Sequence, residues 1–413
     1  MIIKPKVKGF ICVNAHPLGC QKALEAQILQ AENAKFSGPK TALIIGCSSG
    51  YGLASRVALA FGSGTDTLGV HFDREPSKTK TASAGWYNNQ HLEKLARKQG
   101  LAAHSINVDA FQDEAKSSVI ELIKKTIKTV DLVIYSVAAP RRFIASEDKI
   151  YSSVLKPIGE GFQSKTINTD KGIISNIELE AASQDEIDAT VKVMGGEDWQ
   201  QWMVALKDAD VLSETCKTVA YTYRGDEITK PIYGEATIGR AKEDLDRASS
   251  EINTLLSGPG SPSSTSKIGA ENQRAYIGVL KALVTQSSAA IPVMPLYISL
   301  LYKVMKQQGV HESCFEQIVR MLSTGLYGDS CKRDSVGRLR VDEFELADDI
   351  QQEVKSRWNK ITNENLQELS DFEGYRREFL QLFGFHIEGI DYEADIASTA
   401  PYTPEKTQPG GIR

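Results

Sequence analysis

"TALIIGCSSGYGLASRVALAFGSGTDTLGVHFD", residues 41–73, decides the fold of this chain. It opens with a short apolar run and continues with a segment in which Leu53, Val57 and Phe61 share one helical face. It closes with a second apolar run. A strand, a helix and a second strand in this order indicate a βαβ unit, whose crossover helix makes the two strands parallel. The stretch therefore predicts the start of a parallel sheet.

The same alternation continues outward from this unit to about residue 140. Helical patterns at 91–100 and 115–130 each precede an apolar run, at 101–107 and at 131–138. Strands that alternate with helices of this length are typical of a parallel sheet covered on both faces. We predict an α/β fold, a Rossmann-type doubly wound parallel sheet with helices on both faces and additional helical and strand insertions. The pattern does not fix the order of the strands.

Beyond residue 140 the alternation is less regular, and no internal repeat divides the chain. We expect one enlarged catalytic domain with a cofactor-binding half at about 38–140 and a substrate and catalytic half at about 141–398, followed by a flexible tail at 399–413. The segment 257–269 is rich in Gly, Ser and Pro and is expected to be an exposed loop.

The glycines Gly46, Gly50 and Gly52 stand between the first strand and its helix. Glycine lets the backbone turn sharply and approach a pyrophosphate, and a helix N-terminus offers free N–H groups and a positive dipole end. Hydroxyls of Ser48 or Ser49 can add hydrogen bonds. The pattern predicts a dinucleotide site; the alternative is a tight turn with only a structural role.

Asp73 follows the second strand, where a carboxylate can accept hydrogen bonds from the ribose hydroxyls of NAD. A carboxylate repels a 2′-phosphate, so we expect NADH to be preferred over a weaker NADPH. Arg74 can partly offset this because a guanidinium binds phosphate. In the alternative interpretation both residues are solvated loop charges.

Two further pairs follow the third and fourth strands, Asp109 with Ala110 and Val137 with Ala138. In a doubly wound sheet these strand ends face a bound dinucleotide, so we expect the pairs to line the cofactor. Taken alone, each pair is better explained by an ordinary loop than by a ligand site.

Tyr233 and Lys242 stand nine positions apart in "YGEATIGRAK", residues 233–242. On one continuous helix, nine steps of about 100° place the two side chains on opposite faces, separated by ~13 Å. Pro231 and Gly234 disfavour helix around the tyrosine, so the helix can begin after Gly234 and leave Tyr233 free to fold back. A nearby ammonium lowers the pKa of a tyrosine and prepares it to donate a proton. Equally, Tyr233 can be a core aromatic and Lys242 a surface charge.

The totals of this 413-residue chain exclude several classes of function. Its 48 Lys+Arg and 53 Asp+Glu give a net charge of −5 without a basic stripe, which argues against nucleic-acid binding. Six scattered cysteines without C-x-x-C spacing predict neither disulfides nor a metal site. The start carries no export pattern, and the apolar stretch 289–305 is interrupted by two prolines, so we interpret it as a buried helix rather than a membrane span. We expect a cytoplasmic monomer.

Motifs spread over almost the whole chain resemble the FabV-type enoyl-acyl-carrier-protein reductases and the related trans-2-enoyl-CoA reductases, large members of the short-chain dehydrogenase/reductase superfamily. They include "GCSSGYGLASR", "TASAGWYN", "YSVAAP", "VMGGEDWQQW", "TVAYTYRG", "LVTQSSAAIPVMPLYISLLYKVM" and "LFGFHIEGIDYEAD". The Y-x8-K spacing of Tyr233 and Lys242 is specific, since other superfamily members use shorter spacings.

The resemblance implies an enzyme that uses NADH, without metal or flavin, to reduce the trans-2 double bond of enoyl thioesters, the last reductive step of fatty acid elongation. It implies that Tyr233 donates the proton, that Lys242 also holds the cofactor ribose, and that Tyr223 contacts the substrate. The other implied cofactor residues are Gly46, Cys47, Ser48, Ser49, Gly50, Tyr51, Phe72, Asp73, Asp109, Ala110, Val137, Ala138, Leu283, Val284 and Thr285. Two departures bear on selectivity: the family often has glutamate at Asp73, and the loop at 257–275 is longer than usual.

Two alternatives stay open at this point. One is a 3-ketoacyl or carbonyl reductase of the same superfamily, and the other is a non-catalytic NAD-binding protein. The acyl carrier is also open between CoA and acyl carrier protein. Because a carrier protein is acidic, Arg141 and Arg142 are candidates for a basic docking patch, or else ordinary surface charges.

Overall fold

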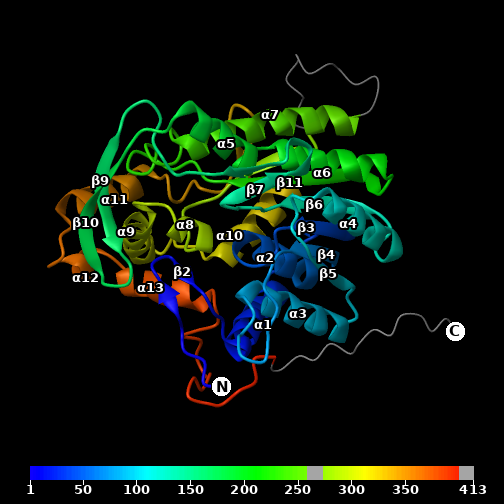
Figure 1. Ribbon diagram of the computed structural model, residues 1–413, viewed down its shortest axis with the longest axis horizontal. Coiled ribbons are helices and arrows are strands. Elements are labelled where there is room, and N and C mark those ends of the chain that lie inside the picture. The colour runs from blue at the N-terminus through cyan, green and yellow to red at the C-terminus, as the bar shows by residue number, and fades with distance from the viewer. Residues whose placement is uncertain (258–272, 400–413) are drawn as a thin grey trace.

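One mixed sheet runs through the middle of the protein, for which a computed structural model describes residues 1–257 and 273–399 (Figure 1). Within these residues its strands lie in the order β13-β14-β12-β11-β6-β3-β4-β5, and only β13 is antiparallel to its neighbour. The strands are β3 (Thr41–Ile45), β4 (Asp66–His71), β5 (Ala103–Asn107), β6 (Val130–Tyr135), β11 (Leu212–Thr222), β12 (Ala275–Val279), β13 (Lys332–Arg333) and β14 (Leu339–Arg340).

The chain order of these strands is that of a doubly wound sheet. From β3 the chain moves outward through β4 to β5, then crosses to β6 on the other side of β3 and moves outward again through β11 to β12. The strand order reverses between β3 and β6, and the carboxyl ends of these two strands are where such sheets bind ligands. The predicted α/β class is confirmed, with the strand order added by the structure.

Both faces of the sheet are buried, as the apolar sequence of β3 requires. Leu43 and Ile45 face one hydrophobic core, while Ala42 and Ile44 face another, because successive side chains of a strand point to opposite faces. Helices cover both cores. On the Ala42 side lie α1 (Pro17–Asn33), α2 (Gly50–Val57), α3 (Ala84–Lys98) and α10 (Cys314–Arg320); on the Leu43 side lie α4 (Asp113–Lys125), α6 (Glu197–Asp208) and α7 (Thr237–Ser257).

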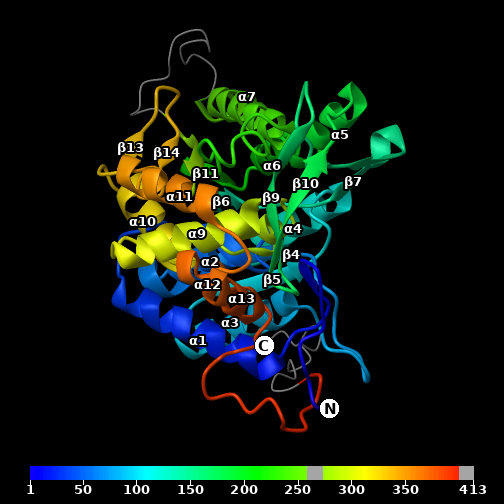
Figure 2. The same cartoon turned by 90° about the vertical axis from the view of Figure 1, so that its left-hand side faces the viewer.

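A third core lies beyond the carboxyl ends of the strands and is built around α9 (Met294–Gln307). Helices α11 (Asp348–Lys360) and α13 (Phe372–Gln381) pack against α9, and Figure 2 shows them in front of the sheet when the molecule is viewed from this side. Eleven of the fourteen residues of α9 are buried, so the predicted buried helix at 289–305 is confirmed from Met294 onward. This core contains Tyr233 and the segment 282–284.

The remaining elements are short helices and hairpins. Short helices are α5 (Gln184–Met194), α8 (Gln286–Ala289) and α12 (Leu366–Leu369); the hairpins pair β1 (Val7–Lys8) with β2 (Ile11–Cys12), β7 (Arg141–Ile144) with β8 (Lys149–Ser152), and β9 (Phe162–Asn168) with β10 (Ile173–Leu179). The helix α2 runs on into a π-helical turn at Ala58–Gly62, and α10 into another at Met321–Leu326. Most of the expected loop at 257–269 and all but the first residue of the expected tail at 399–413 lie outside the described residues.

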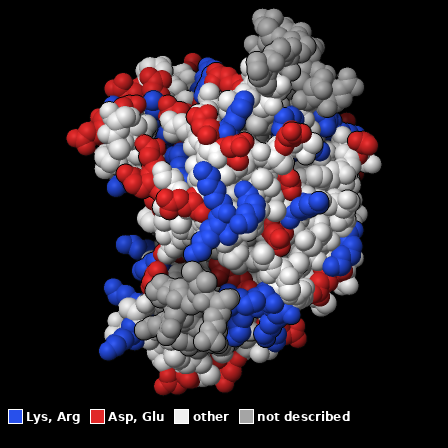
Figure 3. Space-filling view, turned by 90° about the vertical axis from the view of Figure 1, so that its right-hand side faces the viewer, with Lys and Arg blue, Asp and Glu red and all other residues white. Residues whose placement is uncertain are grey.

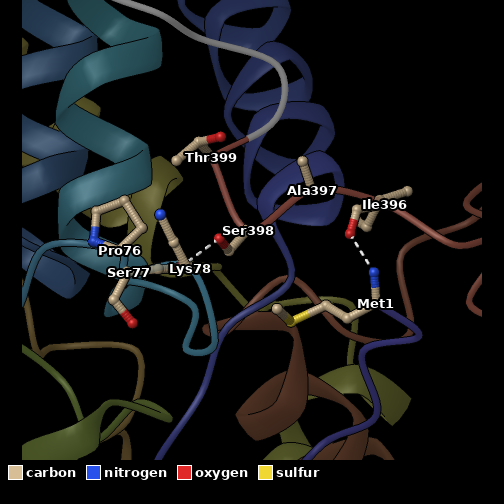
Figure 4. Close-up of a pocket in the computed structure, with 8 residues that line it drawn as sticks. All are labelled: Met1, Pro76, Ser77, Lys78, Ile396, Ala397, Ser398 and Thr399. Carbon is tan, nitrogen blue, oxygen red and sulfur yellow. Dashed lines mark hydrogen bonds between the residues drawn. The ribbon is translucent and has the colours of Figure 1, made fainter.

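The N-terminus and residues 396–399 meet beside the loop that follows β4 (Figure 4). The amino group of Met1 donates to the carbonyl oxygen of Ile396 at 2.6 Å, and Ser398 Oγ donates to the carbonyl oxygen of Ser77 at 2.7 Å. Met1, residues 76–78 and residues 396–399 line a shallow hollow there. None of the predicted site residues lines this hollow, so it is separate from the chemistry considered below.

Charge is mixed on the face shown in Figure 3. Lysine and arginine side chains gather near its centre, with acidic side chains around and between them. Among residues 1–257 and 273–399, no helix combines the length and the apolar character needed to cross a bilayer.

Candidate active site

The turn after β3, the glycine cradle, leaves no room for a side chain at Gly46 or at Gly52. Gly46 has φ of +91°, and a Cβ there would lie 2.2 Å from the carbonyl oxygen of Ser136. At Gly52 a Cβ would lie 2.0 Å from the carbonyl oxygen of Gly46. No side chain caps the N-terminus of α2, which begins at Gly50. The cradle therefore combines close backbone approach with an open helix N-terminus, which suits the pyrophosphate of a dinucleotide.

Asp73 lies beside this cradle, two residues after β4. Its carboxylate accepts hydrogen bonds from Ser48 Oγ at 2.7 Å and Ser83 Oγ at 2.7 Å, and His71 Nδ1 lies 2.9 Å away. Burial alone raises the pKa of Asp73, but the hydrogen bonds from His71, Ser83 and Ser48 outweigh it and lower the pKa. The carboxylate is therefore ionised and held at a fixed place beside the cradle.

Phe72 and Arg74, on either side of Asp73, point to different surroundings. The ring of Phe72 is 74% exposed, which is unusual for a large apolar side chain. The guanidinium of Arg74 donates from Nη2 to the carbonyl oxygens of Val13 at 2.9 Å and Thr81 at 3.3 Å. These two bonds hold Arg74 on backbone oxygens, which leaves Asp73 as the dominant charge beside the cradle.

The other predicted cofactor residues lie at the same edge of the sheet. Asp109 and Ala110 follow β5, and Asp109 Oδ1 accepts from the backbone N–H of Phe111 at 3.1 Å. Val137 and Ala138 follow β6, and the backbone nitrogen of Val137 is 3.2 Å from where a Cβ on Gly46 would lie. Because parallel strands end at one edge, both pairs share it with the cradle.

The segment 283–285 reaches this edge from the third core. The methyl carbon of Thr285 would be 3.6 Å from a Cβ placed on Gly50, so this residue faces the cradle directly. Leu283 and Val284 are buried. The residues predicted to hold NADH thus come from the sheet edge and from the third core. They fit the cofactor, because they combine glycines at which a Cβ would clash, an uncapped helix N-terminus and one fixed carboxylate.

Side chains hold the backbone of 281–285 on every side. Tyr51 Oη donates to the carbonyl oxygen of Lys281 at 2.8 Å, and Tyr302 Oη accepts from the N–H of Val284 at 3.1 Å. Ser288 Oγ accepts from the N–H of Thr285 at 2.9 Å. The position of this segment over the cradle is therefore fixed by hydrogen bonds rather than by regular secondary structure.

Tyr233 stands outside the helix, as its flanking Pro231 and Gly234 predict. It lies in a turn where its N–H donates to the carbonyl oxygen of Thr229 at 2.9 Å, and α7 begins only at Thr237. The side chain is buried at 8% exposure, and its ring meets that of Tyr223 edge to face with centroids 4.9 Å apart. Burial raises the pKa of Tyr233, against a hydrogen bond from the backbone of Tyr223.

Lys242 lies in the second turn of α7 and is partly buried. Within the described residues, its ammonium has no hydrogen bond or ion pair, and burial lowers the pKa of Lys242 to about 8. No hydrogen bond joins Lys242 to Tyr233 in this part of the chain. The role of these residues as a catalytic pair stays a prediction, but both keep polar groups available for a ligand.

Tyr223 is bound to a residue that no sequence pattern singles out. Its hydroxyl lies 3.0 Å from Thr229 Oγ1 and donates to Glu345 Oε1 at 2.9 Å. Glu345 stands in "RVDEFELADD", residues 340–349, where a glutamate among four aspartates and glutamates looks like a solvated charge. In the structure it is fully buried.

Arg142 does not serve the basic docking patch expected from the sequence. Its side chain is 3% exposed and bonds Glu197 Oε2 at 2.7 Å and the carbonyl oxygen of Lys192 at 2.8 Å. The guanidinium can be buried because the Glu197 carboxylate neutralises its charge and the Lys192 carbonyl accepts a further hydrogen bond. Only Arg141 of the pair is exposed. In the described ranges no three His, Cys, Asp or Glu side chains gather as a metal site would require.

Three family models match consecutive segments of the chain. Residues 2–78 match the NAD(P)H binding domain of trans-2-enoyl-CoA reductase, residues 80–327 the trans-2-enoyl-CoA reductase catalytic region, and residues 333–396 an enoyl reductase FAD binding domain. The first two segments share the central sheet, since β3 and β4 belong to one and β5 and β6 to the other.

The residues of 333–396, all of which are described, do not fit a flavin. A dinucleotide needs a strand, a glycine turn and an open helix N-terminus in sequence. Here α11, α12 and α13 follow one another, and α11 and α13 pack against α9 to build the third core. We derive no chemistry from flavin.

Relatives cover nearly the whole chain. The Enoyl-[acyl-carrier-protein] reductase [NADH] of Idiomarina loihiensis is 52% identical over 398 residues, 96% of this chain and 98% of its own length. Enoyl-[acyl-carrier-protein] reductase [NADH] FabV of Aeromonas salmonicida is 49% identical over 96% of this chain and 97% of its length. The crystal structure of a Clostridium acetobutulicum trans-2-enoyl-CoA reductase in complex with NADH superposes with a TM-score of 0.90 at 41% identity, covering 96% of this chain and 98% of the other. This chain belongs to the family of FabV-type enoyl-[acyl-carrier-protein] reductases and trans-2-enoyl-CoA reductases.

Proposed function

We propose that this chain catalyses the NADH-dependent reduction of the trans-2 double bond of enoyl thioesters to the saturated acyl thioester. The observation that carries the proposal is that the segment joining β11 to β12 carries two polar groups that no side chain of the described residues engages, the Tyr233 hydroxyl and the Lys242 ammonium. The names of relatives at about half identity over nearly the full length support the same reaction.

The reaction adds a hydride and a proton across a carbon–carbon double bond. Bound NADH supplies the hydride to the β-carbon of the substrate and leaves as NAD⁺. The electrons of the double bond move to the thioester oxygen, which becomes an enolate and needs a hydrogen-bond donor. A proton then reaches the α-carbon, and the enolate collapses to the saturated thioester.

Tyr233 is the proposed proton donor. Its raised pKa keeps the phenol protonated at neutral pH, and the Lys242 ammonium, positively charged below pH of about 8, stabilises the phenolate that forms. Lys242 also holds the cofactor ribose in this proposal. The cradle 46–51 binds the pyrophosphate, Asp73 the adenosine ribose, and the exposed Phe72 offers a face on which adenine can stack.

The acyl carrier is proposed to be acyl carrier protein, with CoA thioesters as alternative substrates. The support is the printed name of the relatives, enoyl-[acyl-carrier-protein] reductase. Since Arg142 is buried, docking of an acidic carrier has to use other cations, and Arg141 remains exposed. We also propose that the protein works as a monomer in a reducing, cytoplasmic setting; all six cysteines are unpaired thiols.

Tyr233→Phe tests the proposal. With NADH and crotonyl-CoA, the wild-type protein is expected to oxidise NADH, and the variant to lose at least 99% of kcat while binding NADH with unchanged affinity, since general acid catalysis contributes about 10² to 10⁴ in rate. Tyr375→Phe is the matched control because it removes another buried hydroxyl, one that has no partner among the described residues.

Each alternative gives a different result. A carbonyl reductase consumes NADH with acetoacetyl-CoA instead of crotonyl-CoA, and a non-catalytic protein binds NADH without consuming it with either. Turnover by Tyr233→Phe close to the wild-type value would remove Tyr233 as the donor.

A further inference from the structure

Glu345 is a fully buried carboxylate beside the third core, where it contacts residues of the predicted site. It lies between β14 and α11, in the segment whose family model is described as FAD-binding. Its sequence separation from Tyr223 is 122 residues and from Ala282 is 63. It therefore joins two parts of the predicted site that the chain itself keeps apart.

Three donors saturate the carboxylate. Oε1 accepts from Tyr223 Oη at 2.9 Å and from Tyr297 Oη at 2.7 Å, and Oε2 accepts from the backbone N–H of Ala282 at 2.6 Å. Because an ionised carboxylate only accepts, it satisfies all three donors at once. Burial raises the pKa of Glu345, and these hydrogen bonds together with the nearby Lys281 ammonium offset only part of that rise. Lys281 is itself buried and lies against the ring of Tyr302.

The hydrogen bond to Glu345 uses the only proton of the Tyr223 hydroxyl. On its other side this hydroxyl meets Thr229 Oγ1 at 3.0 Å, so its hydrogen-bonding capacity is taken up within the protein. Tyr233, in edge-to-face contact with the Tyr223 ring, has no side-chain partner for its own hydroxyl in the described chain. Of the two adjacent tyrosines, Tyr223 donates its proton to another side chain of the protein, whereas Tyr233 meets only a backbone hydrogen bond from Tyr223.

We propose that Glu345 is a positioning residue for the reaction. Its carboxylate accepts the hydrogen bond of the Tyr223 phenol, which fixes that ring against Tyr233 and leaves Tyr233 as the tyrosine that donates to the substrate. Through Ala282 the same carboxylate holds the segment 283–285 over the cradle. This inference rests on the proposed function, and it gives Tyr223 the role of an anchored wall of the site rather than a second proton donor.

Glu345→Gln changes this arrangement at almost constant volume. If the amide oxygen replaces Oε2, the amide NH2 faces the two hydroxyls and no longer accepts from Tyr223. If the amide is reversed, its NH2 faces the N–H of Ala282, and two donors oppose each other. In both orientations one anchor is lost. We expect kcat with NADH and crotonyl-CoA to fall about tenfold, with KM for crotonyl-CoA and Kd for NADH within about threefold of wild type, as for an interaction that matters in the transition state.

A double-mutant cycle with Tyr223→Phe separates positioning from a general loss of stability. If Glu345 acts through Tyr223, adding Glu345→Gln to Tyr223→Phe lowers kcat less than about twofold, because contacting residues are non-additive. Asp342→Asn is the matched control. It lies three residues earlier, is 2% exposed and bonds Arg340 at 2.7 Å, with no contact to the site, so its kcat per folded molecule stays unchanged.

The outcomes distinguish the inference from the function on which it rests. Wild-type protein that does not oxidise NADH with crotonyl-CoA overturns the proposed function itself. If the wild type is active, two results overturn the role of Glu345. In the first, kcat of Glu345→Gln stays within twofold of the wild-type value. In the second, Glu345→Gln lowers kcat by the same factor with and without the Tyr223→Phe change. If Glu345→Gln fails to fold, Glu345→Asp is compared in the wild-type and Tyr223→Phe proteins instead. Aspartate keeps the negative charge, but its side chain is one methylene shorter and reaches Tyr223 less well.

Discussion

Lys242 is a residue whose burial opposes stability, and in the proposed mechanism its ammonium binds the cofactor. The folded protein lowers its pKa from 10.5 to about 8, so between these values the unfolded chain binds a proton that the folded protein does not. The cost of the buried ammonium is therefore complete below pH of about 8 and disappears as pH rises to 10.5.

Lys242→Met is accordingly expected to stabilise the protein while abolishing turnover. Since the side chain is only partly buried, the gain is about 1 to 2 kcal/mol at pH 7 and close to zero near pH 10.5. Urea unfolding of wild type and variant at pH 7, 9 and 10 measures it. A variant less stable than wild type at pH 7 would show that the ammonium has a stabilising partner in the fold.

Asp73 carries the expected preference for NADH. We expect kcat/KM to favour NADH over NADPH by more than about tenfold, and Asp73→Asn to narrow the ratio toward NADPH because the charge that repels a 2′-phosphate is gone. Arg74→Met is the control, as its guanidinium is held on the carbonyl oxygens of Val13 and Thr81. If Arg74→Met lowers kcat/KM for NADPH, Arg74 contacts the 2′-phosphate, and cofactor preference is then not set by Asp73 alone.

For single residues, the sequence predicted features that depend on neighbours along the chain, and it missed contacts between residues far apart in the chain. The positions of the cradle glycines and of Asp73 were predictable because all of them lie within one βαβ unit, and their role in binding a dinucleotide stays a prediction. Glu345 was not, because its partner Tyr223 is 122 positions away and its neighbours in sequence are acidic residues that resemble a solvated loop. Arg142 shows the opposite case. Its charge suggested a surface position, but the side chain is buried, because acceptors distant in the sequence bind its guanidinium.

The close contact between α2 and β3 is the element-scale feature that builds the cradle. Gly52→Ala places a Cβ 2.0 Å from the carbonyl oxygen of Gly46, and neither backbone can move without disturbing the sheet. We expect a loss of roughly 2 to 4 kcal/mol in unfolding free energy and at least about tenfold weaker NADH binding. Fluorescence titration with NADH and chemical unfolding measure the two effects.

Gly100→Ala provides the contrast to this variant. Gly100 has φ of +75° with open space around it, so alanine there costs about 1 kcal/mol of strain without any overlap. NADH affinity should stay that of wild type. If Gly52→Ala binds NADH as tightly as the wild type does, α2 can shift without disturbing the cradle.

Elements with apolar periodicity were predictable, and elements without it were not. The strands β3 to β6 and the helices between them follow from their buried faces. The β9–β10 hairpin did not, because only Ile167 among its residues is buried and its polar alternation resembles a loop. The helix α3 begins at Ala84, earlier than its apolar pattern suggests, because Asn88 and Asn89 in its first turns are buried against the cradle.

For the whole molecule we propose one catalytic unit rather than separable domains. The matched segments 2–78 and 80–327 share one sheet, and 333–396 completes the third core. Thermal unfolding is expected to follow a single transition, shifted upward by NADH according to RT ln(1 + [L]/Kd), about 2.7 kcal/mol at a hundredfold excess over Kd. Calorimetry with and without NADH tests this. Two resolved transitions, of which NADH moves only one, would indicate independent domains.

The meeting of three cores at one edge has a consequence for the life of the protein in a cell. Predicted cofactor residues come from each core: Cys47 from one, Ala110 from the second, Leu283 from the third. A dinucleotide bound across all three cores favours the closed arrangement of the whole unit by mass action, so it suppresses the locally open forms that proteases attack. Degradation of this enzyme would then slow whenever the nicotinamide pool is full and quicken when it is depleted, which ties the abundance of the protein to the supply of its own reductant.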